Sequence, residues 1–215
     1  MWSKADPTVT TQCAFEIIAV VAQASPGASG LYRARIAAGP LSQMIELART
    51  NGCITVLDIQ VGQSNVPAEI TGLLPWLSQP DVHLALDPEW DMPPGVAPGK
   101  RIGSMTAADI NSALMTLSSL VRDLGLPPKL VVLHRFRDFM VTNPEQVRTT
   151  PEVRLLLNMD GFGGKPNKVS RYQAVRKGFT TNLAGFKLFT KNDTPMLQPV
   201  DVLSLTPPPM FINYQ

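Results

Sequence analysis

The chain has 215 residues, of which 44% are hydrophobic and 17% charged, and its 19 Lys and Arg against 17 Asp and Glu give a formal net charge of +2. This near balance, without any basic run, excludes the usual electrostatic signature of a nucleic-acid-binding protein. No apolar run approaches the roughly 20 residues that a membrane-spanning helix needs, and the length fits one domain over residues 1–215.

The two cysteines, Cys13 and Cys53, are too far apart in sequence for a CxxC motif or a zinc ribbon. Each lies beside an apolar, strand-like run, so we expect buried free thiols, with a single disulfide as the alternative. The first residues, Met1 to Pro7, lack the apolar core of a signal peptide.

In the first half of the chain, apolar runs rich in β-branched residues alternate with amphipathic segments. The predicted elements there are strands over 15–22, 53–60 and 82–87 and helices over 41–50 and 67–77. The run over 53–60 is apolar on both faces until its end, which is typical of a strand buried on both sides.

In the second half, a Pro/Gly-rich stretch over 92–103 is predicted to lack regular structure, and a loop of that length is often functional. The strongest helical pattern covers 107–124, where the apolar residues form one stripe and Gly125 follows. The other predicted elements are strands over 129–136, 153–160, 186–190 and 210–214 and a short helix over 168–177.

Seven strands with helices between most of them predict an α/β protein with parallel strands. We expect a (β/α) TIM-barrel-like fold, either incomplete or seven-stranded, because 215 residues are few for a complete barrel. An open doubly wound sheet is the alternative. The chain has neither GxGxxG after its first strand nor GxxxxGK[ST], so the usual phosphate-binding reasons for the open sheet are missing.

Polar residues follow the apolar part of almost every predicted strand. In both architectures ligands bind at the carboxyl ends of parallel strands, so we expect these residues to meet there. Two carboxyl groups suit glycoside hydrolysis, in which one protonates the leaving oxygen and the other is nucleophile or base. The catalytic candidates are Asp58, Asp87, Glu89 and Asp160, with Glu89 as acid/base and Asp87 or Asp160 as its partner.

The expected substrate-binding residues are polar or aromatic side chains near the same strand ends. They are Gln60, Trp90, His134, Phe136, Asn158, Phe162, Lys187 and Tyr214. Lys187 lies between two apolar residues, so a carboxylate partner is expected if it points inward.

Structural roles compete with these assignments. Asp58 and Asp160 could cap a helix or brace a turn. His83 lies early in its strand and is better explained as a core histidine, whereas the position of His134 favours neither role.

Two other functions fit the same residues. His134 with the four acids would suit Mg²⁺, Ca²⁺ or Mn²⁺ in a metal-dependent phosphodiesterase or lyase, although there are only two histidines and no HxH or HxxxH pair. Apart from such a divalent metal, no cofactor is expected. A non-catalytic carbohydrate or cell-wall binding protein is the third candidate. A serine hydrolase is not supported, because GxSxG is absent.

Several segments resemble a group of largely uncharacterised bacterial, often actinobacterial, secreted or lipoprotein-like sequences. The similar segments are Cys53 to Gly62, His83 to Trp90, Gly99 to Ser104, Asn158 to Gly163 and Gly185 to Phe189. The resemblance implies a TIM-barrel-like, glycosidase-like domain in an extracellular or cell-surface setting, with no assigned substrate. Members of the group are longer at the N-terminus, so a homo-oligomeric partner is one way in which a barrel lacking that part could be completed.

Overall fold

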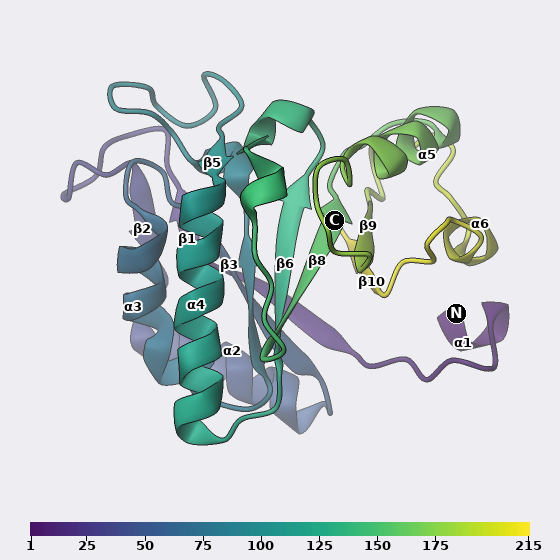
Figure 1. Cartoon of the computed structure of the whole chain (residues 1–215), viewed down its shortest axis with the longest axis horizontal. Helices are drawn as coiled ribbons and strands as arrows, with labels where there is room; N and C mark the ends of the chain where they lie inside the picture. Colours follow the sequence, from purple (N-terminus) through teal and green to yellow (C-terminus); the bar gives the residue numbers. More distant parts are fainter.

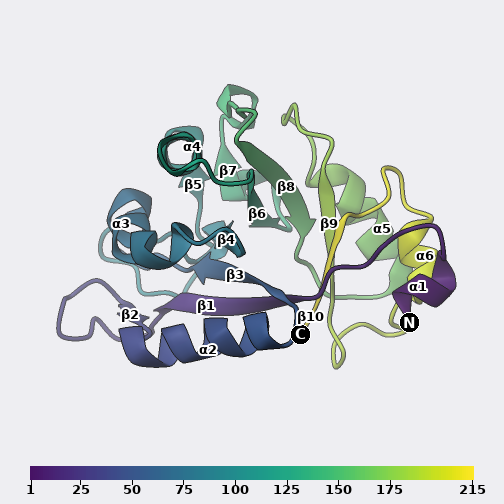
Figure 2. The ribbon, with the colours of Figure 1, turned by 90° about the horizontal axis from the view of Figure 1, so that it is seen from below.

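The protein, described over residues 1–215 by a computed structural model, is built around one curled sheet of eight strands with helices along its outer side (Figures 1 and 2). The strand order is β10-β9-β8-β6-β4-β3-β1-β2. The strands are β1 (Ala14–Ala22), β2 (Arg33–Arg35), β3 (Ile54–Ile59), β4 (Val82–Leu86), β6 (Lys129–Arg135), β8 (Val153–Met159), β9 (Ala184–Leu188) and β10 (Phe211–Tyr214).

Six helices accompany the sheet, and none combines the length and apolarity required to cross a membrane. They are α1 (Trp2–Ala5), α2 (Ala38–Thr50), α3 (Val66–Leu77), α4 (Ala107–Leu124), α5 (Lys165–Ala174) and α6 (Pro199–Leu203). A separate parallel pair, β5 (Met105–Thr106) and β7 (Val141–Thr142), lies outside the main sheet.

The expected (β/α) TIM-barrel-like fold, in its incomplete and seven-stranded forms alike, is wrong. Seven strands are parallel and follow one another in chain order, as in a barrel, but the sheet stays open as a curled half-barrel. Strand β10 pairs only with β9, while β2 pairs antiparallel with Val20–Ala22 of β1 and makes the sheet mixed. No α-helix connects β6 to β8, so the β/α alternation is also broken.

Local sequence signals explain where helices α3 and α4 begin and where α4 ends. Helix α3 begins after Asn65, whose Oδ1 accepts a hydrogen bond from the Ala68 amide at 2.9 Å. Helix α4 begins with a capping box between Thr106 and Asp109 and ends at Gly125, which has a left-handed φ of 61°. The predicted bounds 107–124 are those observed.

The inner face of the sheet carries an apolar layer followed by a polar one. Five buried side chains make the apolar layer, which consists of Val56, Ala85, Val132, Leu156 and Phe211. Because side chains alternate along a strand, the residues two positions later point to the same face. These later residues are Asp58, Asp87, His134, Asn158 and Asn213, and they bring the polar strand ends onto one surface.

The cysteines are not the free thiols that we expected, because Cys13 and Cys53 form a disulfide with 4.5 Å between their Cα atoms. Cys13 directly precedes β1 and Cys53 directly precedes β3, and these two strands are parallel neighbours. Side-by-side strand starts bring the sulfur atoms together despite a separation of 40 residues.

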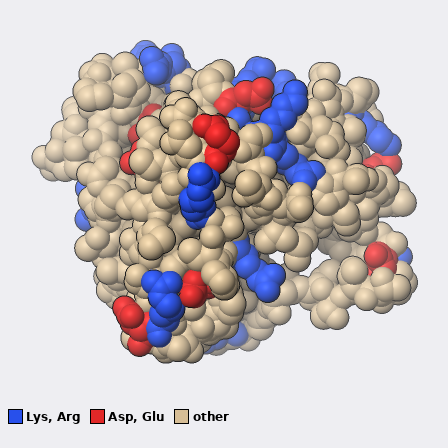
Figure 3. All heavy atoms as spheres, in the orientation of Figure 1, with Lys and Arg blue, Asp and Glu red and all other residues tan.

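Lys and Arg side chains form small, separate groups on the face shown in Figure 3, several of them next to Asp or Glu. Two ion networks illustrate this mixing. Arg33 and Arg35 both bond to the buried Glu69, and Arg49 bonds to Glu46 and to Asp81.

Candidate active site

A pocket of about 480 Å³ opens at the carboxyl ends of the parallel strands. Its walls come from β1, β3, β6, β9 and β10, from the segments that follow β4 and β8, and from helix α5. The lining residues are Glu16, Ile18, Asp58, Gln60, Asp87, Glu89, Trp90, His134, Phe136, Arg137, Asp160, Gly161, Phe162, Arg171, Lys187, Phe189, Tyr214 and Gln215.

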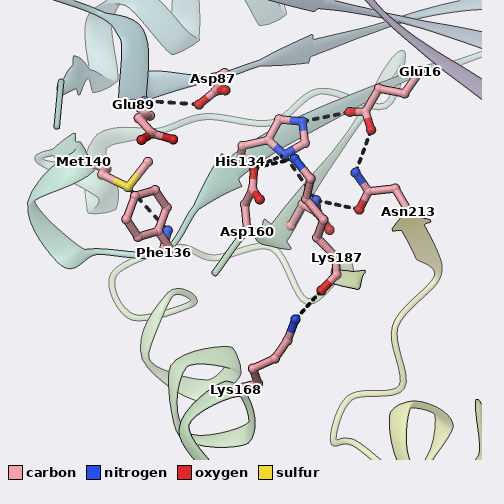
Figure 4. A network of polar contacts seen from close by, with 11 residues as sticks. Glu16, Asp87, Glu89, His134, Phe136, Met140, Asp160, Lys168, Lys187 and Asn213 are labelled. Carbon is pink, nitrogen blue, oxygen red and sulfur yellow. Dashed lines mark hydrogen bonds and ion pairs between the residues drawn. The ribbon is translucent and has the colours of Figure 1, made fainter. Parts of the chain in front are cut away.

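His134 occupies the centre of a charged network on the pocket floor (Figure 4). Its Nε2 lies 2.8 Å from Glu16 Oε1, and its Nδ1 lies 3.1 Å from Asp160 Oδ2. Burial opposes a charge on the imidazole, yet the two carboxylates outweigh it and raise the pKa of His134 well above 6.5. We therefore treat His134 as an imidazolium that donates to both acids.

Lys187 supplies a second cation, since its Nζ donates to Asp160 Oδ2 at 3.0 Å. The carboxylate partner that the sequence requires for Lys187 is thus present. Burial would raise the pKa of Asp160, but His134 and Lys187 outweigh it and lower that pKa below 3.8. Asp160 is consequently held in its ionised form.

Two asparagines extend the network across the open side of the sheet. Asn213 Nδ2 on β10 donates to Glu16 Oε2 on β1 at 2.6 Å, so side chains join the two strands without a backbone ladder. Asn158 Nδ2 donates to Asn213 Oδ1 at 3.1 Å. A Cβ on Gly185 of β9 would lie 2.5 Å from Asn158 Oδ1, so glycine is required for this packing.

Asp58 and Asp87 differ from Asp160 in that both have raised pKa values. Burial, with a smaller contribution from the negative charges of Glu16 and Asp160, raises the pKa of Asp58 to about 6 against the opposing charges of His134 and Lys187. Burial together with Asp58 raises the pKa of Asp87 well above 3.8. Asp87 Oδ1 accepts from the Glu89 amide at 3.2 Å and caps the short helix η1 (Pro88–Trp90). Asp58 Oδ1 is buried without any hydrogen-bond partner.

Glu89 and Asp160 have pKa values that move in opposite directions. Partial burial and the negative charge of Asp160 raise the pKa of Glu89 above 4.5. Asp160, by contrast, has two cationic partners. A carboxyl group with a raised pKa in the same pocket as a carboxylate with a lowered pKa is the arrangement that acid/base chemistry needs.

Aromatic side chains surround these charges. The four expected from the sequence, Trp90, Phe136, Phe162 and Tyr214, all line the pocket, and Phe189 joins them. Phe162 and Tyr214 remain 60% and 46% exposed, and the rings of Phe162 and Phe189 meet edge to face with 5.9 Å between centroids. Exposed rings beside hydrogen-bonding groups suit ligands with both apolar faces and polar edges.

The structure brings eleven of the twelve sequence-predicted site residues to the pocket wall, and Asn158 lies in the network beneath them. Asp58 and Asp160 cap no helix, so that competing interpretation is not supported for them, whereas Asp87 does cap η1. His83 behaves as the expected structural histidine, because its Nδ1 accepts from the Leu130 amide at 3.1 Å and burial lowers its pKa to about 4.

Sequence reasoning missed three charged residues of the pocket, Glu16, Arg137 and Arg171, and did not choose Asn213. Glu16 gave a usable signal, because it is the only acid in the apolar run FEIIAVVA. Arg137 follows β6, and Arg171 lies in α5. In the sequence, neither position distinguishes the residue from an ordinary surface arginine.

No group of three or more His, Cys, Asp or Glu side chains is arranged to hold a metal ion. Both ring nitrogens of His134 already face carboxylates, which leaves the imidazole no free lone pair for a metal. The residues of the metal-enzyme hypothesis therefore share the pocket, and two of them, His134 and Asp160, are paired with each other.

No family model, no curated protein and no solved structure matches the chain. The candidate site therefore stands on its own geometry.

Proposed function

We propose that the protein is a glycoside hydrolase that uses Glu89 as the general acid and Asp160 as its ionised partner. The observation that carries this proposal is the opposite displacement of their two pKa values inside one pocket. In glycosidases, one carboxylic acid protonates the leaving oxygen while a carboxylate acts on the anomeric carbon, directly or through water. The proposed reaction uses no cofactor.

In this mechanism the proton of Glu89 passes to the glycosidic oxygen as the bond from that oxygen to the anomeric carbon breaks. Asp160 either attacks the anomeric carbon or takes a proton from the water that does so. Lys187 and His134 hold Asp160 Oδ2, while no protein group bonds to Asp160 Oδ1, which stays free for this step. Asp58 Oδ1, which lacks a partner, would bond to a sugar hydroxyl.

The rim of the pocket supports a sugar as the ligand. Pyranose rings present an apolar face and a hydroxyl-rich edge, and Trp90, Phe136, Phe162 and Tyr214 offer aromatic surface next to the acids. The Cys13–Cys53 disulfide is of a kind that persists in oxidising compartments, so we place the protein outside the cytoplasm.

The test is a hydrolysis assay on a panel of polysaccharides, in which the release of reducing ends is measured. The wild-type chain is compared with the variants E89Q and D160N. Each substitution should lower kcat by about 100-fold or more, because a positioned acid or base contributes that much, while substrate binding persists. E145Q is the matched control, since Glu145 is an exposed glutamate outside the pocket.

Two results would contradict the proposal. Full activity of E89Q would remove Glu89 from the reaction. Binding of glycans by the wild-type chain without any hydrolysis would instead identify a non-catalytic carbohydrate-binding protein.

A further inference from the structure

The charges in the pocket are unevenly distributed between its two sides. The charged residues that β3 and the segment after β4 contribute are all acids, namely Asp58, Asp87 and Glu89. The opposite side, formed by β6, β8, β9 and α5, contributes all of the cations. These are His134, Arg137, Arg171 and Lys187.

Two of these four cations lack a carboxylate. His134 and Lys187 are bonded to Glu16 and Asp160, so their charges are balanced within the protein. Arg137 and Arg171 form no ion pair with any carboxylate, although both line the pocket. The pocket therefore contains two guanidinium groups, of the exposed Arg137 and the half-buried Arg171, that have no carboxylate partner.

Arg171 is held in place beside the aromatic rim. Its Nη1 donates to the carbonyl oxygen of Phe162 at 3.0 Å. A Cβ on Gly161 would lie 3.2 Å from Arg171 Nη1 and 3.2 Å from Phe136 Cβ, so the side chain packs closely over Gly161, next to Asp160. One carbonyl bond uses only one of the five guanidinium donors, and the others remain for a ligand.

We propose that the sugar bound in this pocket is anionic and that Arg137 and Arg171 bind its charged substituent. The inference rests on the proposed function and names the substrate class of the same site. A carboxylate or a sulfate ester accepts two parallel hydrogen bonds from a guanidinium, a geometry that a neutral sugar hydroxyl does not reproduce. With that group on the cationic side, the rest of the sugar extends toward Glu89.

The test compares matched ligands on the full-length chain. The ligands are uronic-acid oligosaccharides, the same compounds after carboxyl reduction, and sulfated oligosaccharides with their desulfated forms. Dissociation constants are measured by calorimetry for the wild-type chain and for R137Q and R171Q. R154Q is the control, because Arg154 is exposed at the start of β8, away from the pocket.

We expect the wild-type chain to prefer one acidic series over its neutral counterpart, and that series identifies the anion as carboxylate or sulfate. R137Q and R171Q should each weaken the acidic ligand by about tenfold to a hundredfold and leave the neutral one unchanged. R154Q should retain the preference. A purely structural role for Arg171, through its bond to Phe162, would weaken both ligands equally.

Equal affinity for acidic and neutral ligands, or an unchanged preference in both variants, would overturn the inference, as would binding of neither series. Its failure is distinguishable from failure of the proposed function. Arginine-dependent binding of an acidic glycan without hydrolysis removes only the catalytic proposal. Hydrolysis of a neutral glycan with unchanged kinetics in both variants removes only the anionic substrate.

Discussion

Asp58 and Asp160 are both aspartates at the ends of parallel strands, and both are buried, yet the structure shifts their pKa values in opposite directions. Asp160 has His134 and Lys187 within hydrogen-bonding distance and is ionised. Asp58 has no hydrogen-bond partner for Oδ1, so burial dominates and raises its pKa to about 6. The two residues have the same side chain and a similar place at a strand end, so their neighbours decide the direction of the pKa shift.

Substitution D58N should stabilise the fold at neutral pH. A carboxyl whose pKa rises from 3.8 to about 6 on folding binds more protons in the folded state, so its contribution to stability is lost as the pH rises from about 4 to 6. The amide removes this loss, and we expect D58N to raise the free energy of unfolding at pH 7 by about 1–3 kcal/mol. Urea unfolding of D58N and of the wild-type chain at pH 7 and at pH 4 measures this difference in the free energy of unfolding.

At pH 4 the two proteins should differ little, because Asp58 is then protonated in the folded state. The control D123N changes an exposed aspartate on α4 and should shift stability by no more than about 0.5 kcal/mol at either pH. Lower stability of D58N at pH 7 would show that the Asp58 carboxylate is stabilised by the fold.

At the scale of elements, the pairing of β8 with β9 depends on a glycine. We expect G185A to destabilise the protein by about 1–3 kcal/mol, because its Cβ would lie 2.5 Å from Asn158 Oδ1 and 2.7 Å from Leu156 Cδ2. G72A in helix α3 is the matched control. Its Cβ has 3.5 Å to the nearest atom, and alanine in a helix should stabilise by about 0.5–1 kcal/mol. Thermal unfolding of both variants and of the wild-type chain measures these changes. A G185A variant as stable as the wild-type chain would contradict the close packing around Gly185.

The disulfide ties the first two parallel strands together at their starts. Because Cys13 and Cys53 are 40 residues apart, the crosslink restricts the unfolded chain, and the double substitution C13S/C53S should cost about 2–4 kcal/mol. A reductant should lower the Tm of the wild-type chain by a similar extent and leave the double variant unaffected. A wild-type Tm that does not respond to complete reduction would contradict a stabilising role.

Elements with a strong periodic pattern of apolar residues could be predicted from the sequence. An element that exists only because it pairs with a neighbouring strand could not. The seven parallel strands and the helix over 107–124 were found because burial on one or both faces leaves an apolar pattern. Strand β2, with the sequence Arg-Ala-Arg, was missed because it is held by three residue pairs at the edge of β1. Helix α5 begins three residues earlier than predicted, at Lys165, because Pro166 fits the first turn of a helix.

For the whole molecule, the order of the strands was predictable but closure of the sheet was not. Strands in chain order are common to a barrel and to this half-barrel, and the difference lies in which strand pairs with the free edge of β1. The wrong expectation of a closed barrel did not affect the predicted location of the site, because parallel strands bring their carboxyl ends to one edge whether or not the sheet closes. Glu16 and Asn213, which meet across the open side, belong to the part that needed coordinates.

The central claim is that one pocket holds carboxyl groups whose protonation is set by one another and by His134 and Lys187. Titration of the Asp and Glu side-chain carboxyl carbons by NMR tests it directly, with D58N, D87N, E89Q and D160N providing the assignments. We predict that Asp58 titrates near pH 6 and Asp87 well above 3.8, that Glu89 titrates above 4.5, and that Asp160 titrates below 3.8. Four independent titrations close to pH 4 would contradict the claim, and with it the proposed mechanism.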